Sequence, residues 1–238
     1  MGLFPAKSLE LRNGHSDALL VLPGIGYGPS GRRAMKRFFR KAELDLFVPD
    51  YIQRSGIDAS VQFLQEYSTQ HQLALYSRLY IFCFIAGGYV LHRWMQSEGP
   101  EISGVILDRS PYQERAPAIV TRRIPWIARM LLGDFVFELG DARYPQMCDA
   151  LESIGLKPAL IIEKNRTNII KLFAADCRKM GPIQWKPESF ESSFADHCYV
   201  PYDHDSIYAN FDSLAPYIQS FIGSGSFGDV DRNAPEPG

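Results

Sequence analysis

An uninterrupted apolar run, LYIFCF at residues 79–84, constrains the fold more than any other feature of the sequence. A strand that is apolar on both faces has to be covered on both faces, which is the environment of a central strand in a parallel sheet. Two glycines, Gly87 and Gly88, follow closely, and a helical pattern then continues to about Gln96. Because helices cover such strands in doubly wound domains, we expect an α/β domain built on a mostly parallel sheet.

The rest of the chain repeats this alternation of strand and helix patterns. Further strands are expected at residues 8–12, 17–24, 44–50, 102–108, 158–163 and 197–201, the first two around a turn at Asn13-Gly14. Helices are expected at residues 30–42, 58–70, 166–179 and 211–222, with Asp58 as the N-cap of the second. The pattern predicts helices on both faces of the sheet.

The chain length predicts one domain with an insertion. A chain of 238 residues suits a single well-buried α/β domain, which we expect to span residues 1–222. Residues 111–157 interrupt the alternation with several helical pieces, and we expect them to form a short helical cap. Residues 223–238 are rich in Gly, Ser, Asp and Pro, and we expect them to form a flexible C-terminal tail.

The composition argues against several classes of protein. The sequence is 46% hydrophobic and 22% charged with a net charge of −2, so it lacks the basic excess that favours nucleic acid as a partner. Four cysteines, at positions 83, 148, 177 and 198, form no C-x-x-C pair, so neither a disulfide framework nor a zinc site is expected, and no metal or cofactor is predicted. No apolar run approaches the roughly 18 residues of a membrane span, and the N-terminus lacks the apolar core of a signal peptide. We therefore expect a cytoplasmic protein without a transmembrane segment.

One interpretation of the first loop is a dinucleotide site. The segment GYGPSG at residues 26–31 matches G-x-G-x-x-G between a strand and a helix, and Asp50 ends the next strand. Two details argue against this interpretation. The residues Pro23-Gly24-Ile25 lengthen the loop before the motif, and Pro29 removes an amide that would otherwise face a phosphate.

A different resemblance covers more of the chain, about residues 8–222. Six segments resemble, in family order, the conserved blocks of α/β-hydrolases: the oxyanion loop, the next strand and loop, the nucleophile elbow, the strand before the cap, the strand bearing the acid, and the histidine loop with the final helix. These segments are LLVLPGIGYGPSG (19–31), LFVPDYIQRSG (46–56), FCFIAGGYVLHRW (82–94), GVILDRSP (104–111), PALIIEKN (158–165) and YVPYDHDSIYANFDSLAPYIQSFI (199–222). The resemblance implies a central sheet with a cap over its active-site edge.

The same resemblance places unusual residues at the catalytic positions. On the elbow pattern G-x-S-x-G-G, Ile85 falls at the serine and cannot act as a nucleophile. A β-branched residue also disfavours the strained backbone of the elbow, so the turn is expected to relax. Asn165 falls at the position of the acid, while His204 keeps the position of the histidine. Asp108, at the end of its strand, could replace the missing acid.

Three interpretations follow from these departures. The first is a non-hydrolytic pseudo-enzyme that binds a small apolar ligand or a protein partner. The second is a cofactor-independent enzyme such as a lyase, an isomerase or an atypical hydrolase, in which His204 acts as acid or base and the amides of Ile25, Gly26 and Ala86 form an oxyanion hole. The third is another nucleophile, for which Cys83 is the candidate within the elbow, although a buried thiol is usually inert.

Two surfaces are expected to carry contacts. A largely apolar pocket between cap and sheet is expected to be lined by Gly24, Ile25, Gly26, Tyr27, Ile85, Ala86, Trp126 and His204. The helix at residues 30–42 carries two basic stripes that could contact an acidic partner, a phosphate-bearing ligand or an anionic membrane surface. These stripes consist of Arg32, Arg33, Lys36, Arg37, Arg40 and Lys41.

Overall fold

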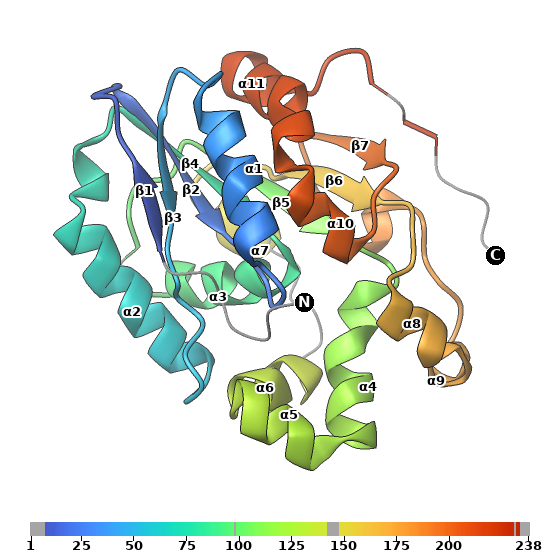
Figure 1. The fold of residues 1–238 in the computed structure, drawn as a ribbon. Coiled ribbons are helices and arrows are strands. Elements are labelled where there is room, and N and C mark those ends of the chain that lie inside the picture. Colours follow the sequence, from blue (N-terminus) through green and yellow to red (C-terminus); the bar gives the residue numbers. More distant parts are fainter. Residues whose placement is uncertain (1–7, 98, 142–147, 231, 234–238) are drawn as a thin grey trace.

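The computed structural model describes residues 8–97, 99–141, 148–230 and 232–233 (Figure 1). Within these residues, seven strands form one sheet in the order β1-β3-β2-β4-β5-β6-β7. The strands are β1 (Leu9–Leu11), β2 (Asp17–Leu22), β3 (Asp45–Val48), β4 (Arg78–Cys83), β5 (Gly104–Arg109), β6 (Ala159–Glu163) and β7 (Asp196–Val200). Every neighbouring pair is parallel except β1 and β3, which confirms the mostly parallel sheet.

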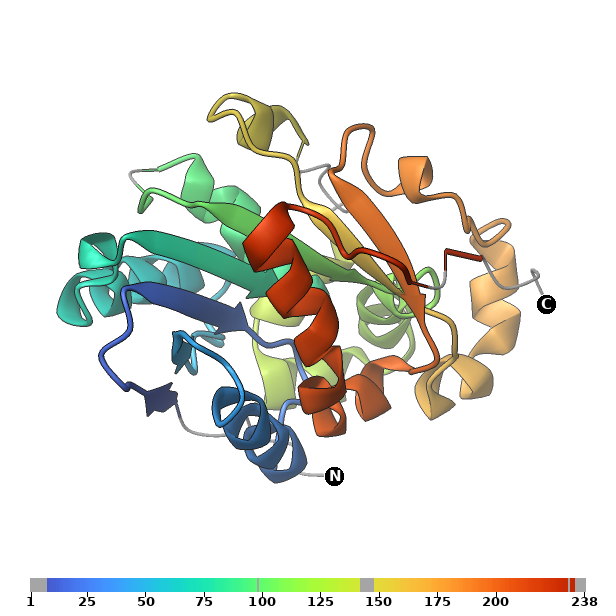
Figure 2. The same ribbon diagram turned by 90° about the horizontal axis from the view of Figure 1, so that it is seen from above.

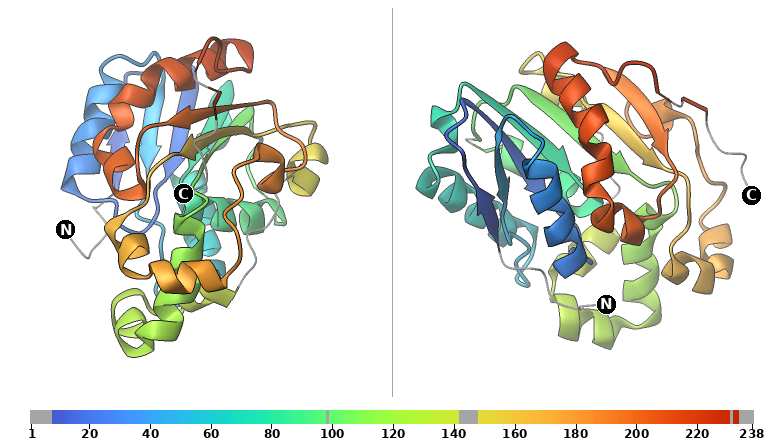
Figure 3. Two further views of the ribbon diagram at one scale, coloured as in Figure 1. Left: turned by 90° about the vertical axis from the view of Figure 1, so that its right-hand side faces the viewer. Right: turned by 45° about the horizontal axis from the view of Figure 1, so that its top comes forward.

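Helices cover both faces of this sheet. The helices are α1 (Pro29–Phe39), α2 (Ile57–Gln70), α3 (Ile85–Met95), α4 (Ala116–Arg123), α5 (Pro125–Leu132), α6 (Phe135–Asp141), α7 (Cys148–Glu152), α8 (Asn168–Leu172), α9 (Ala174–Lys179), α10 (His204–Ala209) and α11 (Ala215–Ser224). Short 3₁₀ turns are η1 (Leu73–Leu75), η2 (Gln113–Arg115), η3 (Pro187–Ser189) and η4 (Phe211–Leu214). Helices α1, α10 and α11 pack on one face, and α2 and α3 on the other (Figures 1 and 2). Helices α4 to α6 form a separate group beyond the sheet, within the segment where a cap was predicted (Figure 3).

The central strand β4 is buried on both faces, as its sequence predicts. Ile81 and Cys83 pack into the core shared with α2 and α3, whereas Phe82 and Phe84 pack into the core shared with α1 and α11. All four side chains are at most 1% exposed. Burial of a large apolar side chain contributes about 1.5–3 kcal/mol to the free energy of unfolding, so β4 anchors both layers.

The first strand does not form the predicted hairpin with β2 and pairs with β3 instead. β1 runs antiparallel to β3, with Leu9 opposite Val48. The loop that follows β1 is held over β3 because the backbone amides of Asn13 and His15 donate to the buried carboxylate of Asp45. This side chain at the start of β3 therefore directs the N-terminal strand to the outer edge of the sheet.

Several element boundaries also differ from the predictions. Helix α2 has Gly56, not Asp58, at its N-cap, and Asp58 lies in the first turn. The helix expected at 166–179 is broken into α8 and α9, and Thr167 caps α8 through its side chain. A further helix, α10, was missed because its short polar start resembles a loop in the sequence.

The expected tail beyond residue 222 is partly wrong. Helix α11 continues to Ser224, and Phe227 is buried against Tyr217 and Phe221. The backbone amide of Phe227 donates to Asp196, at 2.8 Å, which ties this segment to β7. The aromatic side chain thus extends the packed domain, while residues 231 and 234–238 lie outside the described part of the chain.

The described cysteines are free thiols. Cys83, Cys177 and Cys198 are buried and unbridged, and the side chain of Cys148 lies outside the described part. Along the described ranges, every helix is too short or too polar to cross a bilayer.

The close packing of α3 on β2 gives a test of the fold. A Cβ atom at Gly87 would overlap the carbonyl oxygen of Leu22, which is backbone and cannot move aside. Gly87→Ala should therefore lower the free energy of unfolding by about 1–3 kcal/mol, measured by urea denaturation. Gly223→Ala in α11 is the matched control: its Cβ would meet open space, so the change should be neutral or stabilise by up to about 1 kcal/mol. Equal effects of the two changes would contradict the packing described for α3.

Candidate functional site

The candidate site lies where the parallel strands end. In open α/β sheets, ligands bind outside the carboxyl ends of the strands. Here the loop after β2 contributes Gly24 and Ile25, and the start of α3 after β4 contributes Ile85. Strands β5 and β6 end near Asp108 and Glu163, and the loop after β7 leads into His204. Cap helices α4 to α6 close this edge of the sheet (Figure 1).

The imidazole of His204 lies against two buried carboxyl groups. His204 is the first residue of α10, which begins there because Asp203 and Ser206 form a capping box. Its Nδ1 lies 2.9 Å from Oε1 of Glu163 and 3.6 Å from Oδ2 of Asp108. The two carboxyl side chains are fully buried and His204 is nearly so. The hydrogen bond to Glu163 orients the ring, and Asp108 adds a second negative charge at the same nitrogen.

The other ring nitrogen contacts a tyrosine. Tyr208 follows His204 by one helical turn on α10, and its hydroxyl lies 3.2 Å from Nε2. The same hydroxyl accepts a hydrogen bond of 3.0 Å from the backbone amide of Gly24. A Cβ at position 24 would overlap this hydroxyl, so glycine is required for the approach. Nε2, the nitrogen that faces the nucleophile in a serine triad, is thus occupied by a phenol.

The phenol itself is poorly placed to act as a nucleophile. Tyr208 is 2% exposed and does not line the cavity under the cap. Burial and the charges of Asp108 and Glu163 raise the pKa of Tyr208 well above its ordinary value, so the hydroxyl stays protonated. The Tyr208 oxygen is therefore neither accessible to the carbonyl carbon of a substrate nor ionised, as a nucleophile would need to be.

The charges around His204 favour its protonated form. Burial on its own would lower the pKa of His204, but Glu163 and Asp108 together raise it to about 10. Burial and the charge of Asp108 raise the pKa of Glu163 well above its usual range. The raised pKa of His204 favours an imidazolium at neutral pH, and because the pKa of Glu163 is raised as well, the two groups share the proton across their hydrogen bond.

The turn after β4 is relaxed. Phe84 caps α3 in an extended conformation (φ −72°, ψ 165°), and Ile85 is the first helical residue. Among the described non-glycine residues, only Gln72 has a positive φ, so Ile85 avoids the strained backbone of a nucleophile elbow. Cys83 lies inside the strand, and burial raises the pKa of its thiol, which disfavours a reactive thiolate.

An apolar cavity of about 300 Å³ lies between the cap and this edge. Four of the residues expected there line it: Ile25, Ile85, Ala86 and His204. The cap contributes mainly aliphatic side chains, namely Val120, Ile124, Ile127, Leu131, Leu132, Val136 and Leu139. Gly24, Gly26 and Tyr27 are not among the lining residues, since Gly24 contacts Tyr208 and the Tyr27 ring packs beside Tyr208.

The prediction for Trp126 is wrong. Its side chain is 69% exposed, whereas Ile124, Ile127 and Leu131 face the cavity. These three residues follow the three- and four-residue spacing of one helix face, and Trp126 falls on the opposite face with Met130. The spacing of the apolar residues in the sequence already indicated which face of α5 is buried. Trp126 was placed in the pocket because of its large apolar side chain, against this spacing.

Asn165 does not reach His204. Its exposed side chain donates to the carbonyl oxygen of Pro201, at 3.0 Å. The carboxyl group beside the imidazole comes instead from Glu163, two residues earlier at the end of β6. In a strand, residues two apart lie on the same face, so the sequence pattern alone fits Glu163 and Asn165 equally well. Only the end of β6 at Glu163 distinguishes the two positions.

One end of the cavity is polar and was not predicted. Glu114 lines the cavity, and its carboxylate accepts a 2.7 Å hydrogen bond from Nε of the buried Arg109. Nη1 of Arg109 also contacts Glu191 at 2.9 Å, and its guanidinium lies over the ring of Phe190. A buried ion pair with this many contacts holds Glu114 in a fixed orientation toward the cavity.

Asp108, Glu163 and His204 also form a cluster of metal-ligand type. Their donor atoms lie within 4.8 Å of one another, and all three residues are buried. A metal at this cluster would need the lone pair of Nδ1, which instead lies at hydrogen-bonding distance from Glu163. The geometry therefore suits a shared proton better than a metal ion.

The basic helix α1 uses part of its charge within the fold. Arg37 forms a two-pronged ion pair with Asp212, at 2.8 and 2.7 Å, and Arg32 donates to the backbone of Ser8. The other members of the two stripes are exposed: Arg33, Lys36, Arg40 and Lys41. An anionic partner for them stays a prediction.

The protonation of His204 can be measured directly. Because its folded pKa is raised to about 10 from about 6.5, its NMR ring signals should stay those of an imidazolium from pH 6 to 8. The associated stabilisation should be complete below pH 6.5 and be lost as the pH rises through 10. Glu163→Gln should lower the titration midpoint. His92, whose pKa is lowered by burial and by Arg93, is the internal control, and a His204 midpoint below 7 would contradict the assignment.

Comparison with known proteins supports the fold assignment. No family model matches the sequence, and a search of curated proteins finds no match. Similar solved structures include an alpha/beta hydrolase enzyme, MGS-MChE2, from a lagoon-sediment metagenome, with 12% identity, a TM-score of 0.55 and coverage of 92% of this chain and 95% of that chain. The Bacillus licheniformis lipase BlEst2 has 12% identity, a TM-score of 0.58 and coverage of 93% and 99%. MenH from S. aureus has 14% identity, a TM-score of 0.55 and coverage of 91% and 97%.

The sheet order also differs from the 3-2-1-4-5-6 order of dinucleotide-binding domains. The chain therefore has the α/β-hydrolase fold.

Proposed function

We propose that this protein is a non-hydrolytic pseudo-enzyme that binds a small, mostly apolar ligand beneath its cap. The observation that carries the proposal is the pair of side chains found where a serine nucleophile would lie and where it would contact the histidine. Ile85 stands in a relaxed turn at the nucleophile position, and Tyr208 occupies Nε2 of His204. Ester hydrolysis through a covalent intermediate needs both an activated nucleophile and a base that accepts its proton.

The electrostatics of the centre support the same conclusion. A base has to be neutral before it takes a proton, and the two carboxyl groups beside Nδ1 raise the pKa of His204, which disfavours the neutral form. The buried carboxyl groups that produce this shift would not be neutralised by a substrate, because they lie behind the ring. A non-covalent lyase or isomerase that uses His204 as a base receives less support for the same reason.

The cavity supports ligand binding. Its volume of about 300 Å³ is at the lower end of the range for small-molecule sites. Ile85, Ala86 and the aliphatic side chains of the cap supply an apolar wall. Glu114 and Gln113 are the polar groups at one end, so a ligand with one hydroxyl or amine donor and an otherwise apolar body fits best.

Ligand binding can be tested with the neutral apolar dye N-phenyl-1-naphthylamine. The wild type should bind the dye with increased fluorescence and show a higher melting temperature in its presence. Val120→Trp, which fills the cavity, should weaken binding by about tenfold or more. The control Trp126→Ala alters the same cap on its exposed face and should leave binding unchanged. Binding that is insensitive to Val120→Trp would place the dye elsewhere and remove the support for a cavity ligand.

A further inference from the structure

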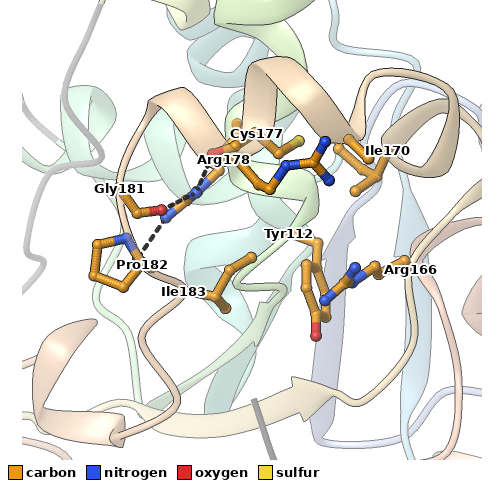
Figure 4. Close-up of a pocket in the computed structure, with 10 residues that line it drawn as sticks. Tyr112, Arg166, Ile170, Cys177, Arg178, Gly181, Pro182 and Ile183 are labelled. Carbon is orange, nitrogen blue, oxygen red and sulfur yellow. Dashed lines mark hydrogen bonds between the residues drawn. The ribbon is translucent and has the colours of Figure 1, made fainter. Parts of the chain in front are cut away.

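A second hollow, of about 560 Å³, is lined by residues of η2, α8, α9 and the loops beside them (Figure 4). Ile169 of α8 lines the cap cavity, whereas the next residue, Ile170, lines this second hollow. The two spaces thus meet neighbouring residues of the same short helix. We propose that the second hollow binds a phosphate monoester that carries a small apolar group.

The charge of the lining is strongly positive. Arg115, Arg166 and Arg178 line the hollow, and none of its described lining residues is acidic. A neighbouring hollow shares Tyr112 and Arg166 and adds two lysines, Lys164 and Lys171, with a single acid, Asp203. The Oδ1 atom of Asp203 accepts the hydrogen bonds of Ser206 that cap α10. On helix α9 itself, Asp176 is engaged by Arg123 of the cap at 2.5 Å.

Arg115 builds one wall of the hollow. Its guanidinium donates to three backbone carbonyls, those of Cys177 and Gly181, both at 2.9 Å, and that of Pro182 at 2.8 Å (Figure 4). These bonds fix the turn after α9 against η2. Because carbonyl groups carry no net charge, they orient the guanidinium without neutralising it. The positive charge of Arg115 is therefore built into the wall.

Two further guanidinium groups come from separate elements. Arg166 precedes α8 and lies 4.4 Å from the centre of the Tyr112 ring, which itself packs edge-on against Trp185 at 5.2 Å. This stacking limits the orientations of the Arg166 side chain. Arg178 projects from α9 into the same space (Figure 4). A planar guanidinium group can donate two parallel hydrogen bonds to two oxygens of one phosphate, which increases both the affinity and the geometric specificity of binding.

The remaining surface is apolar. Ile170, Ile183 and Cys177 line the hollow between the arginines. Three arginine side chains from separate elements favour a dianion over a carboxylate, which suggests phosphate as the anionic group. An apolar substituent on that phosphate would cover the two isoleucine side chains, which gives the class of ligand proposed.

Isothermal titration calorimetry with phenyl phosphate tests the proposal. The wild type should bind phenyl phosphate more tightly than inorganic phosphate and more tightly than benzoate. Arg178→Gln and Arg166→Gln should each weaken binding by about tenfold, because each removes charge-assisted hydrogen bonds. The control Lys179→Gln removes the same charge from the same helix at a position outside the lining, and should change the affinity by less than about twofold.

Each other outcome would overturn the proposal. Equal losses in Arg178→Gln and Lys179→Gln would indicate general charge attraction instead of a site. Benzoate binding as tightly as phenyl phosphate would assign the hollow to carboxylates. Absence of phenyl phosphate binding to a wild type whose melting curve is normal would leave the hollow without a ligand of this class. Val120→Trp should not alter phenyl phosphate binding, so this result is independent of the cap cavity.

Discussion

The hydroxyl group of Tyr208 is the contact on which the candidate site depends. It accepts a hydrogen bond from the Gly24 amide and lies at hydrogen-bonding distance from Nε2 of His204, so it connects the loop after β2 to helix α10. Through the imidazole, the same chain of contacts reaches Glu163 at the end of β6. In an enzyme of this fold, the space beside Nε2 belongs to a nucleophile. Here the hydroxyl of a buried tyrosine lies in that space, and this contact supports the proposal that the protein is non-hydrolytic.

This arrangement also accounts for the unusual charges. Two buried carboxyl groups, Asp108 and Glu163, would be costly if both were charged without a partner, and they share the imidazole of His204, which can carry one compensating positive charge. In a working triad the histidine has to lose and regain its proton in every cycle. A cluster that holds the proton firmly suits a structural role. The cap cavity beside it is mostly apolar, and its polar lining includes His204, Gln113 and Glu114.

Most of the fold could be predicted from the sequence, because it is encoded by local patterns. The apolar run at 79–84 identified the central strand, and the alternation around it identified the layers. The candidate site was harder, since it depends on contacts between distant residues. Tyr208 and Glu163 carry no motif, and only the packing of α10 beside β6 brings them to His204. Trp126 was misplaced for the opposite reason: attention to residue type outweighed the helical spacing that turns it outward.

The central claim is that, among the described residues around His204, no side chain is placed to attack a carbonyl or a phosphonate. Intact-protein mass spectrometry after incubation with a fluorophosphonate probe tests it most directly, with the BlEst2 lipase as a positive control for the reagent. We predict no stoichiometric adduct on the folded protein at neutral pH. A single adduct that forms in the wild type and is lost in His204→Ala would contradict the account, above all if peptide mapping placed it on Tyr208.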